Sequence, residues 1–102
     1  MDSLPVACTL EAEALKARRE GLLAKLLRRA EHHEEWPDGH LFRFAADDEI
    51  VLLIARAIDA ERRCCPFLRF RLTVEPGGGP IELELTGPAG TREFLSAILT
   101  NP

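Results

Sequence analysis

Two segments in which apolar and polar residues alternate, joined by a glycine-rich turn, constrain the fold of this chain most. Leucine, phenylalanine and valine alternate with arginine and threonine over residues 67–74, and isoleucine and leucine alternate with glutamate and threonine over residues 81–86. Successive side chains of a strand point to opposite faces, so each segment predicts a strand with one apolar face. The intervening residues 75–80 contain only glutamate, proline and glycine and are typical of a hairpin turn.

The register of this hairpin follows from the charges on its polar face. Pairing Val74 with Ile81 places Arg71 directly opposite Glu84. Such a cross-strand pair contributes only about 0.2–1 kcal/mol, but a slip by one residue would turn the apolar set toward solvent. We therefore predict this register.

Helical spacing of apolar residues indicates three further elements. In the second of them Ile50, Ile54 and Ala57 share one face, and Pro66 ends the helix because the residue before a proline is pushed out of helical geometry. The predicted helices run from Thr9 to about Glu31, from Asp47 or Asp48 to Pro66, and from about Ala89 or Thr91 to Leu99.

A short strand over residues 40–45, with Phe42 and Phe44 toward the core, completes the element order α-β-α-β-β-α. The connection through the second helix is expected to be a right-handed crossover. We expect residues 1–102 to form a single α+β domain with a small mixed three-stranded sheet and the helices packed on one face. Three strands leave unpaired edges, so we expect a homodimer that forms through an edge or through the first helix.

Composition excludes several classes of protein. The chain of 102 residues is 46% hydrophobic, which disordered chains are not, and its net charge of −4 disfavours nucleic acid as a partner. No apolar run approaches the roughly 20 residues of a membrane span. Residues 1–5 lack the basic and apolar regions of a signal peptide. We expect a cytoplasmic protein without a membrane partner.

No catalytic arrangement is recognisable. Ser96 lacks a nucleophile context, and His32 and His33 are expected at the solvated end of the first helix. His40 follows the turn residues 37–39 and is expected to be a solvated turn residue. We predict no catalytic residues, so enzymatic activity is not the favoured function.

The cysteines are the one distinctive chemical feature. Cys64 and Cys65 follow Glu61 by three and four residues, so the apolar stripe of the second helix, continued, reaches all three side chains. Cys8 is the third cysteine, and an odd count argues against a disulfide framework. Adjacent thiols suit a soft ion such as mercury, arsenic or copper, and they are too closely spaced for a typical structural zinc site.

Two interpretations of these cysteines remain open. In the first, Cys64 and Cys65 are thiolate ligands of a soft metal or metalloid, Cys8 is a third, and Glu61 is a fourth ligand or supports the others. In the second, the cysteines are core packing in a non-catalytic structural or protein-interaction domain. No cofactor is predicted other than such a metal ion.

The segment Glu61-Arg62-Arg63-Cys64-Cys65-Pro66-Phe67-Leu68-Arg69-Phe70, together with Ala7-Cys8-Thr9-Leu10 and Leu85-Thr86-Gly87-Pro88, resembles a family of small, uncharacterised bacterial proteins. The resemblance spans nearly the whole chain. The family is associated with heavy-metal resistance settings, so the resemblance implies Cys8, Glu61, Cys64 and Cys65 as the positions to test, without implying a reaction.

Overall fold

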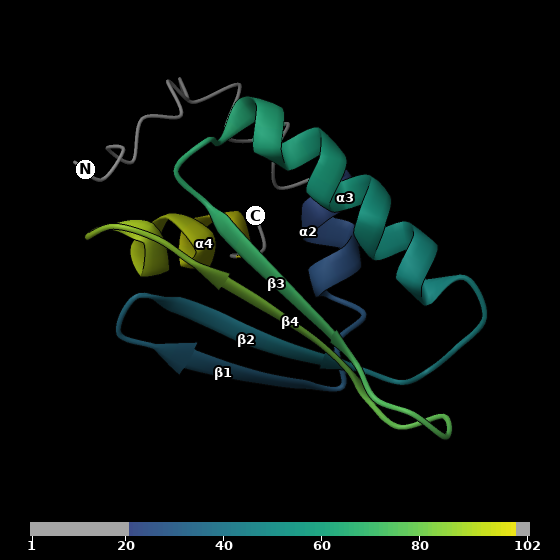
Figure 1. The fold of residues 1–102 in the computed structure, drawn as a ribbon. Helices are drawn as coiled ribbons and strands as arrows, with labels where there is room; N and C mark the ends of the chain where they lie inside the picture. Colours follow the sequence, from purple (N-terminus) through teal and green to yellow (C-terminus); the bar gives the residue numbers. More distant parts are fainter. Residues whose placement is uncertain (1–20, 100–102) are drawn as a thin grey trace.

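Three helices and four strands make up the computed structural model, which describes residues 21–99 (Figure 1). The predicted helix at residues 91–99, the hairpin and the central helix are all present. Along the chain the elements are α2 (Leu22–Leu27), β1 (His32–Trp36), β2 (Gly39–Phe44), α3 (Ile50–Cys64), β3 (Arg69–Val74), β4 (Ile81–Thr86) and α4 (Thr91–Leu99).

The sheet has four strands in the order β1-β2-β4-β3, and every neighbouring pair is antiparallel. The α+β class is confirmed, whereas the predicted mixed sheet of three strands is wrong. Strands β2 and β3 point the same way, but β4 inserts between them, so the crossover through α3 creates no parallel pair. The hairpin register is confirmed, with Val74 opposite Ile81 and Arg71 opposite Glu84.

The first helix ends earlier than the predicted Glu31, and strand β1 follows it. The described part of that helix is α2, which ends at Leu27, while residues 9–20 lie outside the described residues. The N–H groups of Arg29 and Ala30 donate to the carbonyls three residues earlier, as in a 3₁₀ turn. The next N–H, that of Glu31, donates to the carbonyl of Arg43 at 2.8 Å. The chain thus leaves the helix directly into the antiparallel ladder with β2.

Gly39 joins β1 to β2 and lets β4 come close. It is buried in β2 opposite Trp36, and a Cβ atom at this position would collide with the carbonyl oxygen of Leu85 in β4. Only a residue without a side chain permits this approach. The Asp38-Gly39 signal therefore marks a tight hairpin rather than a loose helix end.

The helices lie on one face of the sheet, as predicted, and share one core with it (Figure 1). Fully buried side chains come from the strands and from all three described helices, including Leu83, Leu85, Ala24, Ile54, Leu95 and Ile98, each 0% exposed. On the opposite face Arg43 pairs with Glu82 through hydrogen bonds of 2.9 and 3.0 Å. None of the helices within residues 21–99 is long and apolar enough to cross a membrane.

Candidate functional site at the end of α3

The two adjacent cysteines lie at the C-terminal end of helix α3: Cys64 is its last residue, and Cys65 follows it. The apolar stripe predicted from Ile50 onward faces the core, and Glu61, on the same face, is only 5% exposed. The Cys65 N–H donates to the carbonyl of Glu61 at 2.7 Å and closes the last turn. Pro66 prevents a further turn, so α3 ends at Cys64, shortly before the predicted boundary at the proline.

The two adjacent cysteines lie in opposite environments. Cys65 is 0% exposed and belongs to the hydrophobic core, whereas Cys64 is exposed. Cys64 is the last residue of α3, whereas Cys65 follows the helix with a non-helical backbone and turns into the core. The prediction that the stripe continues to both cysteines is therefore correct for Cys65 and wrong for Cys64.

The sulfur chemistry of the two residues also differs. Cys65 is disulfide-bonded, while Cys64 carries a reduced thiol. The predicted third ligand, Cys8, lies outside the described residues. Within residues 21–99, no group of three or more histidine, cysteine, aspartate or glutamate side chains is placed to hold a metal ion.

Two basic residues precede Cys64 in the sequence, and one acidic residue pairs with both of them. Arg62 Nε donates to Asp59 Oδ1 at 3.1 Å, and Arg63 Nη2 donates to Asp59 Oδ2 at 2.9 Å. All three side chains are more than half exposed. One carboxylate thus partly neutralises the charges of the two arginines.

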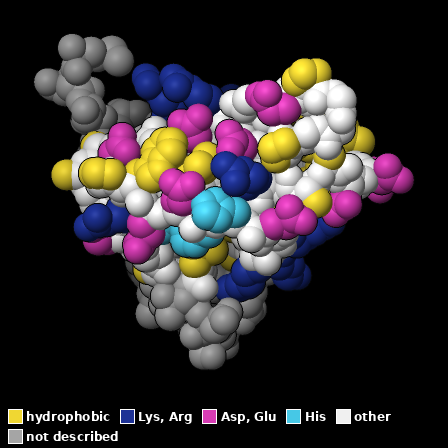
Figure 2. All heavy atoms as spheres, turned by 90° about the horizontal axis from the view of Figure 1, so that it is seen from below, with side chains coloured by type: hydrophobic (Ala, Val, Ile, Leu, Met, Phe, Trp, Pro, Cys, Tyr) yellow, Lys and Arg dark blue, Asp and Glu magenta, His cyan; other side chains and the backbone are white. Residues whose placement is uncertain are grey.

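A second cluster of polar side chains was not anticipated from the sequence. His40 is 1% exposed, so its predicted place in a solvated turn is wrong, and His33 lies on β1 rather than at a helix end. The ladder sets Phe42 opposite His33 and sets His40 on the same face of β2. The His33 ring stacks on both, with centroids 4.7 Å from His40 and 4.6 Å from Phe42. Figure 2 shows histidine side chains among acidic and basic ones on this side of the molecule.

The hydrogen-bond partners of His33 and His40 indicate which of their ring nitrogens carry a proton. His40 Nε2 lies 3.1 Å from the carbonyl oxygen of Arg92, which can only accept, so Nε2 carries a proton. In neutral His40 the Nδ1 atom then accepts from the Nε2–H of His33. Because Nε2 donates, His40 cannot act as the base for Ser96, whose hydroxyl lies 3.3 Å from it. The cluster ties β1 and β2 to α4 and does not form a hydrolytic triad.

The surroundings of His33 oppose its protonation. Partial burial is the main reason that its pKa is lowered from the usual 6.5, and the neighbouring His40 acts in the same direction. Glu35, on the same strand, acts in the opposite direction but does not prevail. His33 therefore prefers the neutral form that donates to His40.

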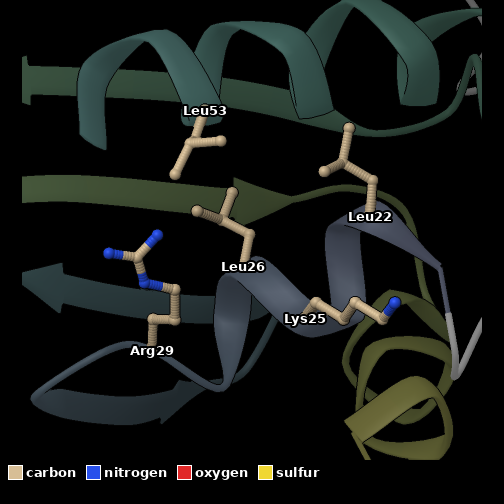
Figure 3. A pocket seen from close by; sticks show the side chains of 5 residues that line it. All are labelled: Leu22, Lys25, Leu26, Arg29 and Leu53. Carbon is tan, nitrogen blue, oxygen red and sulfur yellow. The ribbon is translucent and has the colours of Figure 1, made fainter. Parts of the chain in front are cut away.

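A small hollow lies at the outer seam between α2 and α3 (Figure 3). Its volume is about 100 Å³, well below the roughly 300–1,000 Å³ of typical small-molecule pockets. It can hold about one aliphatic side chain. Its lining combines three leucines with two basic residues: Leu22, Leu26, Leu53, Lys25 and Arg29.

No protein-family model matches the sequence, and neither a curated protein nor a solved structure is significantly similar to it. The resemblance built on the Glu61–Phe70 segment consequently stays a prediction.

Proposed function

We propose that this protein binds a soft metal ion or metalloid through its cysteines in the reduced state. Cys64 and Cys65 are the first ligands, Cys8 is the third, and Glu61 completes or supports the set. The observation that carries the proposal is the exposed, reduced thiol of Cys64, a residue that directly precedes a second cysteine in the sequence. Thiolates are the protein ligands that ions such as Hg(II), Cu(I) and As(III) prefer.

Binding by both residues requires reduction of the disulfide at Cys65. A cytosolic dithiol supplies two electrons and two protons, becomes a disulfide itself and leaves two protein thiols. The ion then displaces one proton from each thiol that binds it. Cys64, being exposed, is the residue that an ion from solvent meets first. This chemistry fits the cytoplasm, where thiols are kept reduced.

The full-length reduced chain provides the test. We would titrate it with Hg(II), As(III) and Cu(I) in the presence of glutathione, follow the sulfur-to-metal absorbance, and count ions per chain by native mass spectrometry. Zn(II) is the comparison ion. We expect one ion per chain, binding weakened at least about tenfold in Cys64→Ser and in Cys65→Ser, and a smaller loss in Glu61→Gln.

Two results would contradict the proposal: binding no tighter than that of glutathione, or retention of wild-type affinity in both serine variants. In either case the alternative function, a protein-interaction domain with cysteines as core packing, would be favoured. The complete burial of Cys65 in the hydrophobic core supports that alternative.

A further inference from the structure

The contact between His33 and His40 connects an edge strand to the interior. Strand β1, which carries His33, lies at one edge of the sheet and pairs only with β2 (Figure 1). The His33 ring stacks on Phe42, which is 1% exposed, and its Nε2–H donates to His40, which is also 1% exposed. His33 itself is exposed. An exposed side chain of the edge strand thus covers two buried side chains of β2.

The neutral pair leaves one ring nitrogen for a first proton. His40 Nε2 donates to the carbonyl of Arg92, and His33 Nε2 donates to His40 Nδ1. His33 Nδ1 takes no part in these two bonds and carries no proton in the neutral ring. A first proton therefore binds there. It leaves both hydrogen bonds intact and gives the bond between the rings a charged donor, which strengthens it.

A second proton has only His40 Nδ1 to bind. This nitrogen accepts the hydrogen bond from His33, so its protonation sets two N–H donors against each other. It also places two positive charges in stacked rings whose centroids are 4.7 Å apart. Like charges at this distance repel, so the pair takes up its protons in two separate steps, the second at lower pH.

The charged side chains of β1 do not remove this repulsion. Partial burial of His33 and the nearby His40 keep the pKa of His33 below 6.5, although Glu35 acts to raise it. His32, when charged, adds to the repulsion. The Glu35 carboxylate also accepts a hydrogen bond from Ser96 of α4, at 3.4 Å.

The neighbouring elements α4 and β4 offer little further compensation within residues 21–99. Glu93 of α4 interacts electrostatically with His40, but its carboxylate already accepts two hydrogen bonds from Arg92, at 3.0 and 3.2 Å. Both of these side chains are more than 40% exposed, so solvent screens them. On β4 the residue opposite His40 is the buried, apolar Leu85.

We propose that the His33–His40 pair is a two-step proton switch for the edge strand. The pair keeps β1 attached while it is neutral and after it has taken up one proton, and it releases β1 when it takes up the second. Release withdraws the His33 ring from Phe42 and His40. Acid thus exposes the face of β2 that β1 covers at neutral pH.

Nitrogen-15 NMR of the imidazole rings in the full chain, titrated from neutral to acidic pH, tests the order of protonation. At neutral pH both rings should carry their proton on Nε2. In the first step His33 should become an imidazolium while His40 Nδ1 stays unprotonated, and in the second step His40 should follow. Amide hydrogen exchange, corrected for the intrinsic effect of pH, should show protection in the β1–β2 ladder falling at least about tenfold with the second step. Protection in the β3–β4 ladder should not change with it.

Two glutamine variants of adjacent histidines give the matched comparison. In His33→Gln the side-chain amide can donate to His40 Nδ1 or, after rotation, accept from it, and it never becomes charged. Protection of its β1–β2 ladder should therefore change less than about threefold over the same interval. His32→Gln alters the other face of β1, where His32 bonds to Glu34, and should keep both steps. Both positions are exposed, so far-ultraviolet circular dichroism should match the wild type.

The proposal is wrong if His40 takes the first proton, or if the β1–β2 ladder stays protected after the second. It is equally wrong if His33→Gln loses protection with the same pH dependence as the wild type. Simultaneous loss of protection in both ladders would indicate unfolding of the whole domain instead of release of one strand. None of these outcomes depends on metal binding by the cysteines.

Discussion

The cysteine pair at the end of α3 and the histidine pair between β1, β2 and α4 differ in how distance along the sequence relates to distance in space. Cys64 and Cys65 are neighbours in sequence, yet Cys64, the last residue of α3, is exposed and Cys65, just beyond the helix, is buried in the core. His33 and His40 are seven residues apart, yet the antiparallel register brings their rings into a hydrogen bond. Residues adjacent in the sequence thus have their sulfurs in different environments, whereas strand pairing brings the imidazoles of two distant residues together.

The largest expected effect is the difference in reactivity between the thiols of Cys64 and Cys65. In protein reduced with a phosphine, an alkylating reagent should modify Cys64 faster than Cys65 by about a thousandfold or more, because exposing a core residue costs several kcal/mol. Peptide mass spectrometry after timed labelling measures both rates. In denaturant the two rates should converge. Equal rates in the native state would mean that Cys65 is accessible and that the contrast does not exist.

The next effect tests whether the histidine pair is structural. His40→Ala should lower the free energy of unfolding by about 2–4 kcal/mol, because it leaves a cavity in the interior and removes the hydrogen bonds of His40 to the Arg92 carbonyl and to His33. His33→Ala, at an exposed position, should cost about 1 kcal/mol or less. Urea denaturation measures both values. A loss in His40→Ala no greater than that in His33→Ala would show that burial of His40 contributes little.

A smaller effect depends on pH. Because the pKa of His33 is lowered in the folded chain from 6.5, the unfolded chain binds more protons below that pH. The wild type should thus lose stability as the pH falls from 6.5 toward the lower folded pKa. His33→Gln should lose less over this interval, as judged by the two unfolding midpoints. Parallel pH dependences in both proteins would exclude His33 as the source.

The smallest effect is expected at the ion pairs beside Cys64. Asp59→Asn removes the carboxylate that engages Arg62 and Arg63 and should lower stability by about 0.5 kcal/mol at low salt. The difference should shrink at high salt, where exposed charges are screened. Thermal unfolding at two ionic strengths measures it. A loss of several kcal/mol would indicate that Asp59 has a buried role.

Local patterns account for the elements that were predicted well. In the β3–β4 hairpin the apolar alternation and the pair Arg71–Glu84 are sufficient to set the register. The stripe from Ile50 to Glu61 sets the buried face of α3, and Pro66 sets its end. Each of these signals lies within one element or between immediate neighbours along the chain, so no knowledge of distant contacts is needed.

Strand β1 had no such signal. Its residues His32–Trp36 are mostly polar on both faces, since one face is open and the other meets His40 and α4 through polar atoms. A strand of this kind is recognisable only by its partner β2. The histidine cluster could not be predicted for the same reason, because its members become neighbours only after β1 pairs with β2 and α4 packs on them.

The sequence by itself determined the α+β class, the hairpin, the course of α3 and the position of two cysteines and a glutamate at its end. Periodicity and proline geometry act over a few residues, so they can be evaluated along the chain. Only the tertiary structure decided the fourth strand, the burial of His40 and the separate environments of Cys64 and Cys65. These depend on which surfaces meet across the sheet, and burial is a property of the assembled core rather than of any single segment.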